Sequence, residues 1–265
     1  MSDSKFWLNR AIDHIETAHP EGEVVLESGF GPSGIFHLGH LREILTVDAL
    51  RWGLEQRGRQ AKHILFIDDF DALRKVPVNV DSSFEQYLGM PVYLVPSPDG
   101  SNKNYAEHFF SEFFEAIKAQ GVETEVLWAH EQYQAGKFTD HITRTLQNND
   151  RVHDIIESVS HRQLKRDWVP IQILSDNNRL DEWSFKSFDS DKQTVSYIDN
   201  NGQEGEISYA DGRVKLNWRI DWPARWAIWG VQVEPFGRDH ATKGGSYDTG
   251  KAIIEEIFDT PAPLP

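Results

Sequence analysis

Two histidines, His37 and His40, stand three positions apart around Gly39 and follow a segment rich in glycine, proline and serine. Residues 27–40 read ESGFGPSGIFHLGH. A neutral imidazole can donate a hydrogen bond to a phosphate oxygen, and a glycine lets an anion approach the main chain. At the start of a helix, unpaired backbone N–H groups and the positive end of the helix dipole add to that attraction. This segment is therefore predicted to bind the phosphates of a nucleotide such as ATP.

The flanking sequence predicts that the histidine segment joins a strand to a helix. Val24, Val25 and Leu26 indicate the end of a buried strand. Apolar residues then recur at helical spacing over residues 41–54, until Gly58. The glycines and histidines are thus expected at the mouth of a sheet.

Strands and helices alternate through the first half of the chain. Residues 62–68 indicate a second buried strand, residues 105–119 a helix and residues 125–129 a third strand. This alternation predicts an α/β fold with a doubly wound parallel sheet. Ligands of such sheets bind outside the carboxyl ends of the strands, where the histidine segment and the acidic end of the second strand fall.

In the second half of the chain, short strand-like segments replace the alternation of strands and helices. Residues 170–216 contain short strand-like pieces, with the pair Asn201-Gly202 predicting the turn of a β-hairpin, and we interpret them as a small β-rich insert. Residues 231–235 indicate another strand, and a glycine-rich loop leads from it to a helix over residues 251–258. The sequence then ends in PAPLP, which is typical of a connection.

The composition restricts the chemistry. With 265 residues, 39% of them hydrophobic, the chain has no apolar segment of membrane-spanning length. The absence of cysteine excludes disulfides, thiolate catalysis and cysteine-ligated zinc in this chain. The N-terminal residues lack signal-peptide features and predict an amphipathic helix, so a cytoplasmic location and no membrane partner are expected.

The charge balance is acidic. The 27 Lys and Arg against 42 Asp and Glu give a formal net charge of -15, which repels polyanions at long range. Strong non-specific nucleic-acid binding is therefore not expected. Residues 72–77 (ALRKVP) and 151–168 are the nearest candidates for a local basic face, although scattered solvated charges are the simpler interpretation of both.

The histidine tetrad resembles the His-x-Gly-His signature of class I aminoacyl-tRNA synthetases and their nucleotidyltransferase relatives. Further motifs, in the same order and approximate spacing, make nearly the whole chain similar to class I lysyl-tRNA synthetases: ESGFGPSGIFHLGHLRE, DDFDALRKVP, YAEHF, EQYQAGKF, KLNWRIDWPARW and VEPFGRDHATKGGSYDTG. The resemblance implies a Rossmann-like catalytic domain of the HUP type, formed by residues 1–169 and 217–265 around the insert at 170–216.

The resemblance implies that the chain binds L-lysine and ATP and makes lysyl-adenylate, from which the family transfers lysine to its tRNA. His37 and His40 would be catalytic by stabilising phosphate charge, together with Mg2+ that accompanies ATP. Because the carboxylate of lysine is already the nucleophile, no general base is needed. Matching positions imply an ATP site of Pro32, Ser33, Gly34, His37, Gly39, His40, Gly237, Asp239 and His240.

A lysine pocket needs a carboxylate or polar acceptors for the ammonium group and an aromatic wall along the apolar stem. Residues of these types fall in the matching motifs: Glu27, Ser28, Gly29, Asp68, Asp69, Trp218, Trp222, His240 and Tyr247, with Asp71 and Trp226 beside them. Any one of the tryptophans could instead pack in the core, and any aspartate could cap a helix. The spacing leaves open which carboxylate meets the ammonium.

Three features depart from the family. The chain ends before a Lys-Met-Ser-Lys-Ser-type loop and before the anticodon-binding region, so reduced activity is expected from a trimmed catalytic core or a short paralogue. The insert lacks the cysteine pairs of many relatives, so neither zinc nor another metal site is expected, and His153 and His161 are isolated. A non-catalytic module that binds lysine or an adenylate stays open, as do tRNA charging and oligomeric state. A cofactor-forming adenylyltransferase would leave the DWPARW and GRDHATKGGSY matches unexplained.

Overall fold

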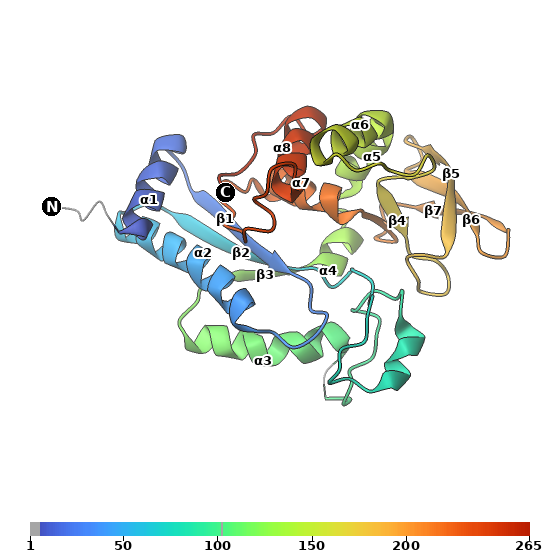
Figure 1. The fold of residues 1–265 in the computed structure, drawn as a ribbon, viewed down its shortest axis with the longest axis horizontal. Coiled ribbons are helices and arrows are strands. Elements are labelled where there is room, and N and C mark those ends of the chain that lie inside the picture. The colour runs from blue at the N-terminus through green and yellow to red at the C-terminus, as the bar shows by residue number, and fades with distance from the viewer. Residues whose placement is uncertain (1–5, 102) are drawn as a thin grey trace.

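A parallel sheet lies at the centre of the structure, a computed structural model that describes residues 6–101 and 103–265 (Figure 1). Its strands are β1 (Val24–Phe30), β2 (Ala61–Ile67) and β3 (Glu125–Trp128), in the order β1-β2-β3. Phe30 pairs with Ile67 and Ile67 with Trp128, so the three strands end side by side at their carboxyl ends. The predicted parallel α/β fold, of Rossmann-like kind, is confirmed.

The first strand corrects one prediction. Val24 begins β1 and does not lie near its end, because the strand continues through Glu27, Ser28 and Gly29 to Phe30. The polar residues Glu27 and Ser28 do not indicate a buried strand, yet the side chain of each has a polar neighbour inside the protein. Ser28 contacts a histidine of β2 and Glu27 lies near an arginine of a later helix. Successive side chains of a strand point to opposite faces, so Glu27 and Ser28 face different layers.

One face of the sheet is covered by α1 (Trp7–Ala18), α2 (Leu38–Gln56) and α3 (Tyr105–Ala119). The predicted periodicity of these helices is confirmed by their buried side chains, such as Ile44 of α2 packed with Leu65 of β2. Burying a residue of this size completely contributes roughly 1.5–3 kcal/mol. The helix α2 connects β1 to β2 and therefore begins beside the carboxyl end of β1.

The opposite face packs against helices from the second half of the chain: α4 (Ala129–Gln134), α5 (Thr139–Gln147), α6 (Asn149–Ser160), α7 (Trp218–Trp229) and α8 (Ser246–Ile257). Phe66 of β2 joins this layer, with its ring 5.3 Å from that of Trp229. In Figure 1, α7 and α8 lie across the sheet from α2 and α3. Helices thus lie on both faces of the sheet.

The strand expected over residues 231–235 is reduced to two isolated parallel bridges. Val233 pairs with Leu26 of β1 on the edge away from β2, and with Leu264 on its own other side. The backbone N–H of Glu27 donates to the carbonyl of Val233 at 3.0 Å. This short contact places Glu234 and the loop that follows beside β1.

Residues 170–216 contain two small antiparallel sheets. One pairs β4 (Ile171–Ile173) with β8 (Val214–Leu216), and the other contains β5 (Trp183–Asp189), β6 (Thr194–Asp199) and β7 (Glu204–Ser208). The predicted hairpin is confirmed between β6 and β7, where Gly202 adopts a φ of 79° that glycine tolerates. A 3-10 helix at Ser82–Tyr87 lies in the long connection between β2 and α3. In the described ranges no helix is long and apolar enough to cross a membrane.

Candidate active site

A cleft of about 180 Å³ opens at the carboxyl ends of β1 and β2. Its lining comes from four parts of the chain that are distant in sequence: β1, α2, the end of β2, and the segment from α7 onward. These residues are Gly29, Glu43, Asp68, Trp218, Trp222, Arg225, Glu234, Phe236 and His240. Five candidate lysine-binding residues therefore meet in one place: Gly29, Asp68, Trp218, Trp222 and His240.

A buried arginine forms one wall of this cleft. One guanidinium nitrogen of Arg225 lies 3.4 Å from the carboxylate of Asp68 and 3.7 Å from that of Glu27. Its Nε lies 3.1 Å from Asp221, one helical turn earlier in α7. Burial alone would lower the pKa of Arg225, but the surrounding carboxylates more than offset this and raise it. Arg225 is therefore charged, and it fixes the position of Asp68.

Gly29 makes room for that arginine. A Cβ at this position would lie 3.2 Å from the carbonyl oxygen of Phe66 and 3.3 Å from Nη1 of Arg225. The guanidinium also lies over the Phe66 ring, 4.4 Å from its centroid. The absence of a side chain at position 29 thus lets the arginine pack against β1.

Carboxylates outnumber cations around the cleft. Glu43, Asp68 and Glu234 line it, and Arg225 is the one cationic side chain in that lining. Burial raises the pKa of Glu43 and of Glu234 to about 7, and that of Asp68 to about 6. An excess of desolvated carboxylates favours a cationic ligand, whose charge would offset their repulsion.

Glu27 lies deeper, beneath the cleft. Its carboxylate is completely buried, and neither oxygen has a hydrogen-bond partner within residues 6–101 and 103–265. Burial, and next the charge of Glu234, raise the pKa of Glu27 well above its ordinary value. Glu27 therefore belongs to the electrostatic surroundings of Arg225 and does not line the cleft.

Aromatic rings form the other wall. The ring of Trp222 lies 6.1 Å from that of Trp218, 5.6 Å from that of Phe236 and 5.3 Å from that of His240. Such a surface suits a flexible aliphatic chain that ends in a cation. Trp226 is fully buried behind this wall, as the core-packing alternative for the tryptophans predicts.

The paired histidines form the N-terminus of α2. His37 is the N-cap, and its Nδ1 accepts a hydrogen bond of 3.1 Å from the backbone N–H of Gly39. Nδ1 of His40 accepts one of 3.2 Å from the backbone N–H of His37. The two rings stack with centroids 4.0 Å apart. Because each Nδ1 accepts, each neutral ring carries its proton on Nε2 and can donate it to an external acceptor.

Burial of His40, and next the proximity of His37, lower the pKa of His40 to about 4. His40 is therefore a neutral hydrogen-bond donor at neutral pH. Gly39 leaves room for the ring of His37, because a Cβ at position 39 would lie 2.8 Å from Cε1 of that ring. The local sequence thus folds into a helix start that presents two imidazoles.

The second predicted nucleotide loop lies opposite this helix start. A small hollow of about 100 Å³ is lined by Gly39 and Arg42 from α2 and by Phe236 and Gly237 from the loop, among others. The carboxylate of Asp239 folds back over Gly237, since a Cβ there would meet Oδ1 of Asp239 at 2.5 Å. Asp239 is otherwise exposed, with 80% of its side-chain surface accessible. The structure thus brings the two candidate ATP segments together.

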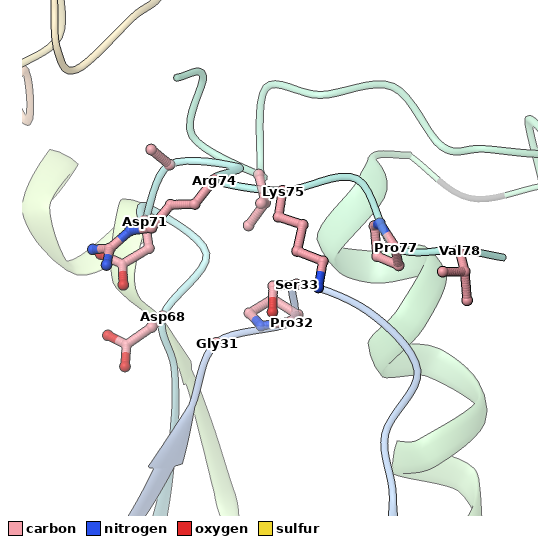
Figure 2. A pocket seen from close by; sticks show the side chains of 11 residues that line it. Gly31, Pro32, Ser33, Asp68, Asp71, Arg74, Lys75, Pro77 and Val78 are labelled. Carbon is pink, nitrogen blue, oxygen red and sulfur yellow. The ribbon is translucent and has the colours of Figure 1, made fainter. Parts of the chain in front are cut away.

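A third cavity, of about 550 Å³, lies on the other side of Asp68 (Figure 2). It is lined by Pro32 and Ser33, which the sequence motif assigned to ATP, and by residues of the loop that follows β2. Gly34 lies at the edge of this cavity, where an added Cβ would be 3.2 Å from Cγ of Pro77. These three residues are therefore separated from the hollow between Gly39 and Gly237.

Three candidate lysine-binding residues have other roles. Ser28 faces the α2 layer, where its Oγ lies 2.8 Å from Nε2 of buried His63. The Asp69 carboxylate accepts the backbone N–H of His130 at 2.9 Å and also contacts its ring, at the start of α4. Tyr247 donates its hydroxyl to the carbonyl of Pro263 at 2.7 Å. The polar atoms of Ser28 and Asp69 are thus used inside the fold, and neither these two residues nor Tyr247 line the cleft.

Sequence reasoning missed four residues of the cleft: Glu43, Arg225, Glu234 and Phe236. Glu43 lies three positions after His40, so helical spacing would have placed it on an adjoining face of α2. Glu234 stood in a predicted strand and gave no local signal. Arg225 belongs to the quoted DWPARW motif, but its burial depends on long-range packing.

In the part of the chain that the structure describes, no group of three or more His, Cys, Asp or Glu side chains is placed so that it could hold a metal ion. His153 lies on α6, 3.9 Å from Glu157, and His161 is an exposed residue that ends the helix.

The parallel sheet, the helix start with paired histidines and the adjoining acidic and aromatic cleft define a class I synthetase-type nucleotide-binding domain. The chain belongs to the family described as tRNA synthetases class I (K), whose model matches residues 5–265. The resemblance to class I lysyl-tRNA synthetases is thus confirmed at the level of the family.

Several relatives are named lysine–tRNA ligases. The chain is 41% identical over 251 residues to lysine–tRNA ligase 1 of Methanosarcina acetivorans, covering 94% of this chain and 47% of that protein. It is 39% identical over 241 residues to the lysine–tRNA ligase of Archaeoglobus fulgidus, covering 91% and 48%. The enzyme of Pyrococcus horikoshii is 37% identical over 267 residues, covering 97% and 50%. The chain spans about half the length of the curated relatives it matches.

Proposed function

We propose that this chain activates lysine with ATP to form lysyl-adenylate, as the catalytic domain of a class I lysine–tRNA ligase. The observation that carries the proposal is the cleft beside the paired histidines, in which three carboxylates and one arginine face an aromatic wall. The names of the relatives support lysine as the amino acid.

The cleft suits lysine by charge and by shape. The ammonium group would lie among Glu43, Asp68 and Glu234, whose mutual repulsion it relieves. The four methylene groups would lie along Trp218 and Trp222. Arginine would be disfavoured in a cleft of about 180 Å³ because its guanidinium is larger, and a neutral isostere would leave the carboxylates unpaired.

ATP would lie between α2 and the loop around Gly237, with its phosphates toward His37 and His40. In the adenylation step a carboxylate oxygen of lysine bonds to the α-phosphorus, and the bond from that phosphorus to the bridging oxygen of pyrophosphate breaks. The Nε2–H groups of the histidines donate to phosphate oxygens as negative charge develops. Mg2+ would arrive with ATP and neutralise part of the phosphate charge.

We also propose the finer architecture: a doubly wound sheet of the HUP type, formed by residues 1–169 and 217–265, with residues 170–216 inserted. Helices on both faces and the bridges of Val233 support the first part. The pairing of β4 with β8 brings the two ends of the insert together, which supports the second. A cytoplasmic location and tRNA as the acceptor of lysine belong to the same proposal.

The test is lysine-dependent exchange of labelled pyrophosphate into ATP. The parent chain should catalyse this exchange. In a His37→Ala, His40→Ala double variant the exchange rate should fall at least about a hundredfold, because both hydrogen-bond donors to the phosphates are missing. A His153→Ala, His161→Ala double variant is the matched control and should behave as the parent. Equal exchange by both double variants would contradict the role of the paired histidines. Lysine binding in a calorimeter without exchange by the parent would instead identify a binding module.

A further inference from the structure

Phenylalanine rings surround one of the two paired histidines. Measured between centroids, the ring of His40 lies 5.0 Å from that of Phe36 and 5.3 Å from that of Phe30. The ring of Phe113, a residue of α3, lies 6.5 Å away. His40 is half-buried, whereas His37 is exposed. The two histidines of the helix start therefore have different surroundings.

Phe36 is held in turn by Phe113, which is distant from it in the sequence. The two rings stack, with centroids 4.5 Å apart and planes inclined by 12°. Phe36 directly precedes His37, the N-cap of α2. In Figure 1, α2 and α3 cover the same face of the sheet. The packing of α3 therefore reaches the segment from which the paired histidines extend.

This packing restricts the direction of the His40 ring. The ring is inclined by 72° to that of Phe36 and by 60° to that of Phe30. Its Nδ1 also accepts the backbone N–H of His37 at 3.2 Å. A side chain that is hydrogen-bonded at one atom and packed between two rings has little freedom to turn. The Nε2–H of His40 therefore points in a fixed direction.

The same rings limit the contact of His40 with water. Strand β1 and helix α3 present uncharged phenylalanine rings to it, and the ionisable group that faces it is His37. A protonated His40 would carry a hydrogen on Nδ1 and could no longer accept the backbone N–H of His37. Because burial disfavours the charged form, the aromatic surroundings preserve this hydrogen bond.

Phe36 and Phe113 also line a surface groove of about 400 Å³. Ile35, another residue of its lining, is 64% exposed. The two stacked rings thus contact the groove as well as His40. Replacement of either ring by a smaller side chain would give water a path from the groove to His40.

We propose that Phe36 and Phe113 are positioning residues: their stack fixes the direction of the His40 Nε2–H and keeps water away from that ring. The effect on ATP rests on the proposed function, in which this N–H donates to a phosphate oxygen. Phe113 acts through Phe36 and through its own contact with His40. Helix α3 thereby contributes to phosphate binding without itself contacting the nucleotide.

The first test is an NMR titration of the histidine rings of the whole chain, without ATP or lysine. The resonance of His40 is identified by its loss in His40→Gln. In Phe113→Leu water would reach the ring, so the titration midpoint of His40 should rise from about pH 4 by about one pH unit, toward its ordinary value. Phe113→Tyr retains the stacked ring, and the groove has space for its hydroxyl, so its midpoint should equal that of the parent.

Phe114→Leu is the matched control. Phe114 follows Phe113 in α3 and is also half-buried, but its ring stacks on that of Phe110, with centroids 5.2 Å apart. Its loss should lower the thermal unfolding temperature about as much as Phe113→Leu does and leave the midpoint of His40 unchanged. Phe36→Leu removes the other ring of the stack and should raise the midpoint as Phe113→Leu does.

Pyrophosphate exchange at saturating lysine is the second test. In Phe113→Leu the ratio kcat/KM for ATP should fall about tenfold, because one hydrogen-bond donor to the phosphates is misdirected. The KM for lysine should not change, since neither ring of the stack lines the lysine cleft. Phe113→Tyr and Phe114→Leu should exchange at the rate of the parent.

The inference is overturned if the midpoint of His40 is the same in the parent, Phe36→Leu and Phe113→Leu, or if Phe114→Leu raises it equally. It is also overturned if Phe113→Leu raises the midpoint but retains the kcat/KM for ATP. Absence of exchange from the parent would instead refute the proposed function. The titration separates the two failures, because it needs neither substrate.

Discussion

The indole N–H of Trp222 donates a hydrogen bond of 2.8 Å to Oε2 of Glu234, which joins the aromatic wall of the cleft to its acidic side. Trp226 donates its indole N–H to the same oxygen. Burial raises the pKa of Glu234 to about 7, while Arg225 and these donors limit the rise. The charge of the cleft therefore changes within the pH range of ordinary assays.

This shift predicts that lysine use falls as the pH is lowered. Carboxylates with pKa values of about 7 for Glu43 and Glu234, and about 6 for Asp68, are ionised above those values and neutral below them. The ammonium of lysine stays charged throughout. The ratio kcat/KM for lysine should therefore decrease by about tenfold per pH unit below about pH 7.

Pyrophosphate exchange at varied lysine concentration and pH measures this ratio. Glu234→Gln should raise KM for lysine and remove part of the pH dependence, whereas Glu131→Gln, on the exposed side of α4, should leave the profile unchanged. A profile that stays flat between about pH 6 and about pH 8 would contradict the assigned role of the carboxylates.

Gly29→Ala should raise KM for lysine by about tenfold while the chain still folds. The new Cβ, 3.3 Å from Nη1, would displace the guanidinium of Arg225 into the cleft. The matched control is Gly31→Ala, where the nearest atom outside the adjacent residues lies 3.9 Å from the added Cβ. Exchange kinetics and thermal unfolding of the two variants test the prediction, and an unchanged KM in Gly29→Ala would show that the arginine need not pack against β1.

Lys215→Met should lower the free energy of unfolding by about 3–5 kcal/mol, because it leaves buried charges uncompensated. Lys215 is 1% exposed and lies 2.7 Å from Asp71 and 3.6 Å from Asp221. Lys186→Met is the control: its pair with Glu204 is 44% and 66% exposed and should contribute less than about 1 kcal/mol. Urea unfolding of both variants measures the two free energies of unfolding. Similar decreases in the two variants would show that the buried ion pair stabilises the fold no more than the exposed one.

The sequence predicted the layers of the fold because each relies on a local signal. Apolar periodicity located α2 and α3, and the run of residues 62–68 located β2. The paired histidines were found for the same reason, since a helix cap is formed by residues close in sequence. Signals within a few residues of one another were therefore sufficient for the elements and for the histidine turn.

The floor of the cleft could not be predicted in this way. Arg225 meets Glu27 and Asp68 only after α7 packs on the sheet, and Glu234 reaches β1 through a single bridge at Val233. The extension of β1 through polar residues also concealed the alternation of its faces. Once the strand is known to run to Phe30, Ser28 must face the layer opposite to Glu27 and Gly29.

That alternation yields the last prediction: Ser28→Ala should lower stability without altering lysine use. Loss of the 2.8 Å hydrogen bond leaves the ring of His63 without that partner in the core, at a cost of about 1–3 kcal/mol. Burial lowers the pKa of His63 to about 3, so the ring cannot recover the loss by protonation at neutral pH. Ser184→Ala, on an exposed position of β5, should have little effect on either property. Thermal unfolding and the KM for lysine, measured on the same samples, distinguish the two roles of Ser28. If Ser28 contacted lysine, the substitution would raise KM; if its role is structural, the substitution should change stability alone.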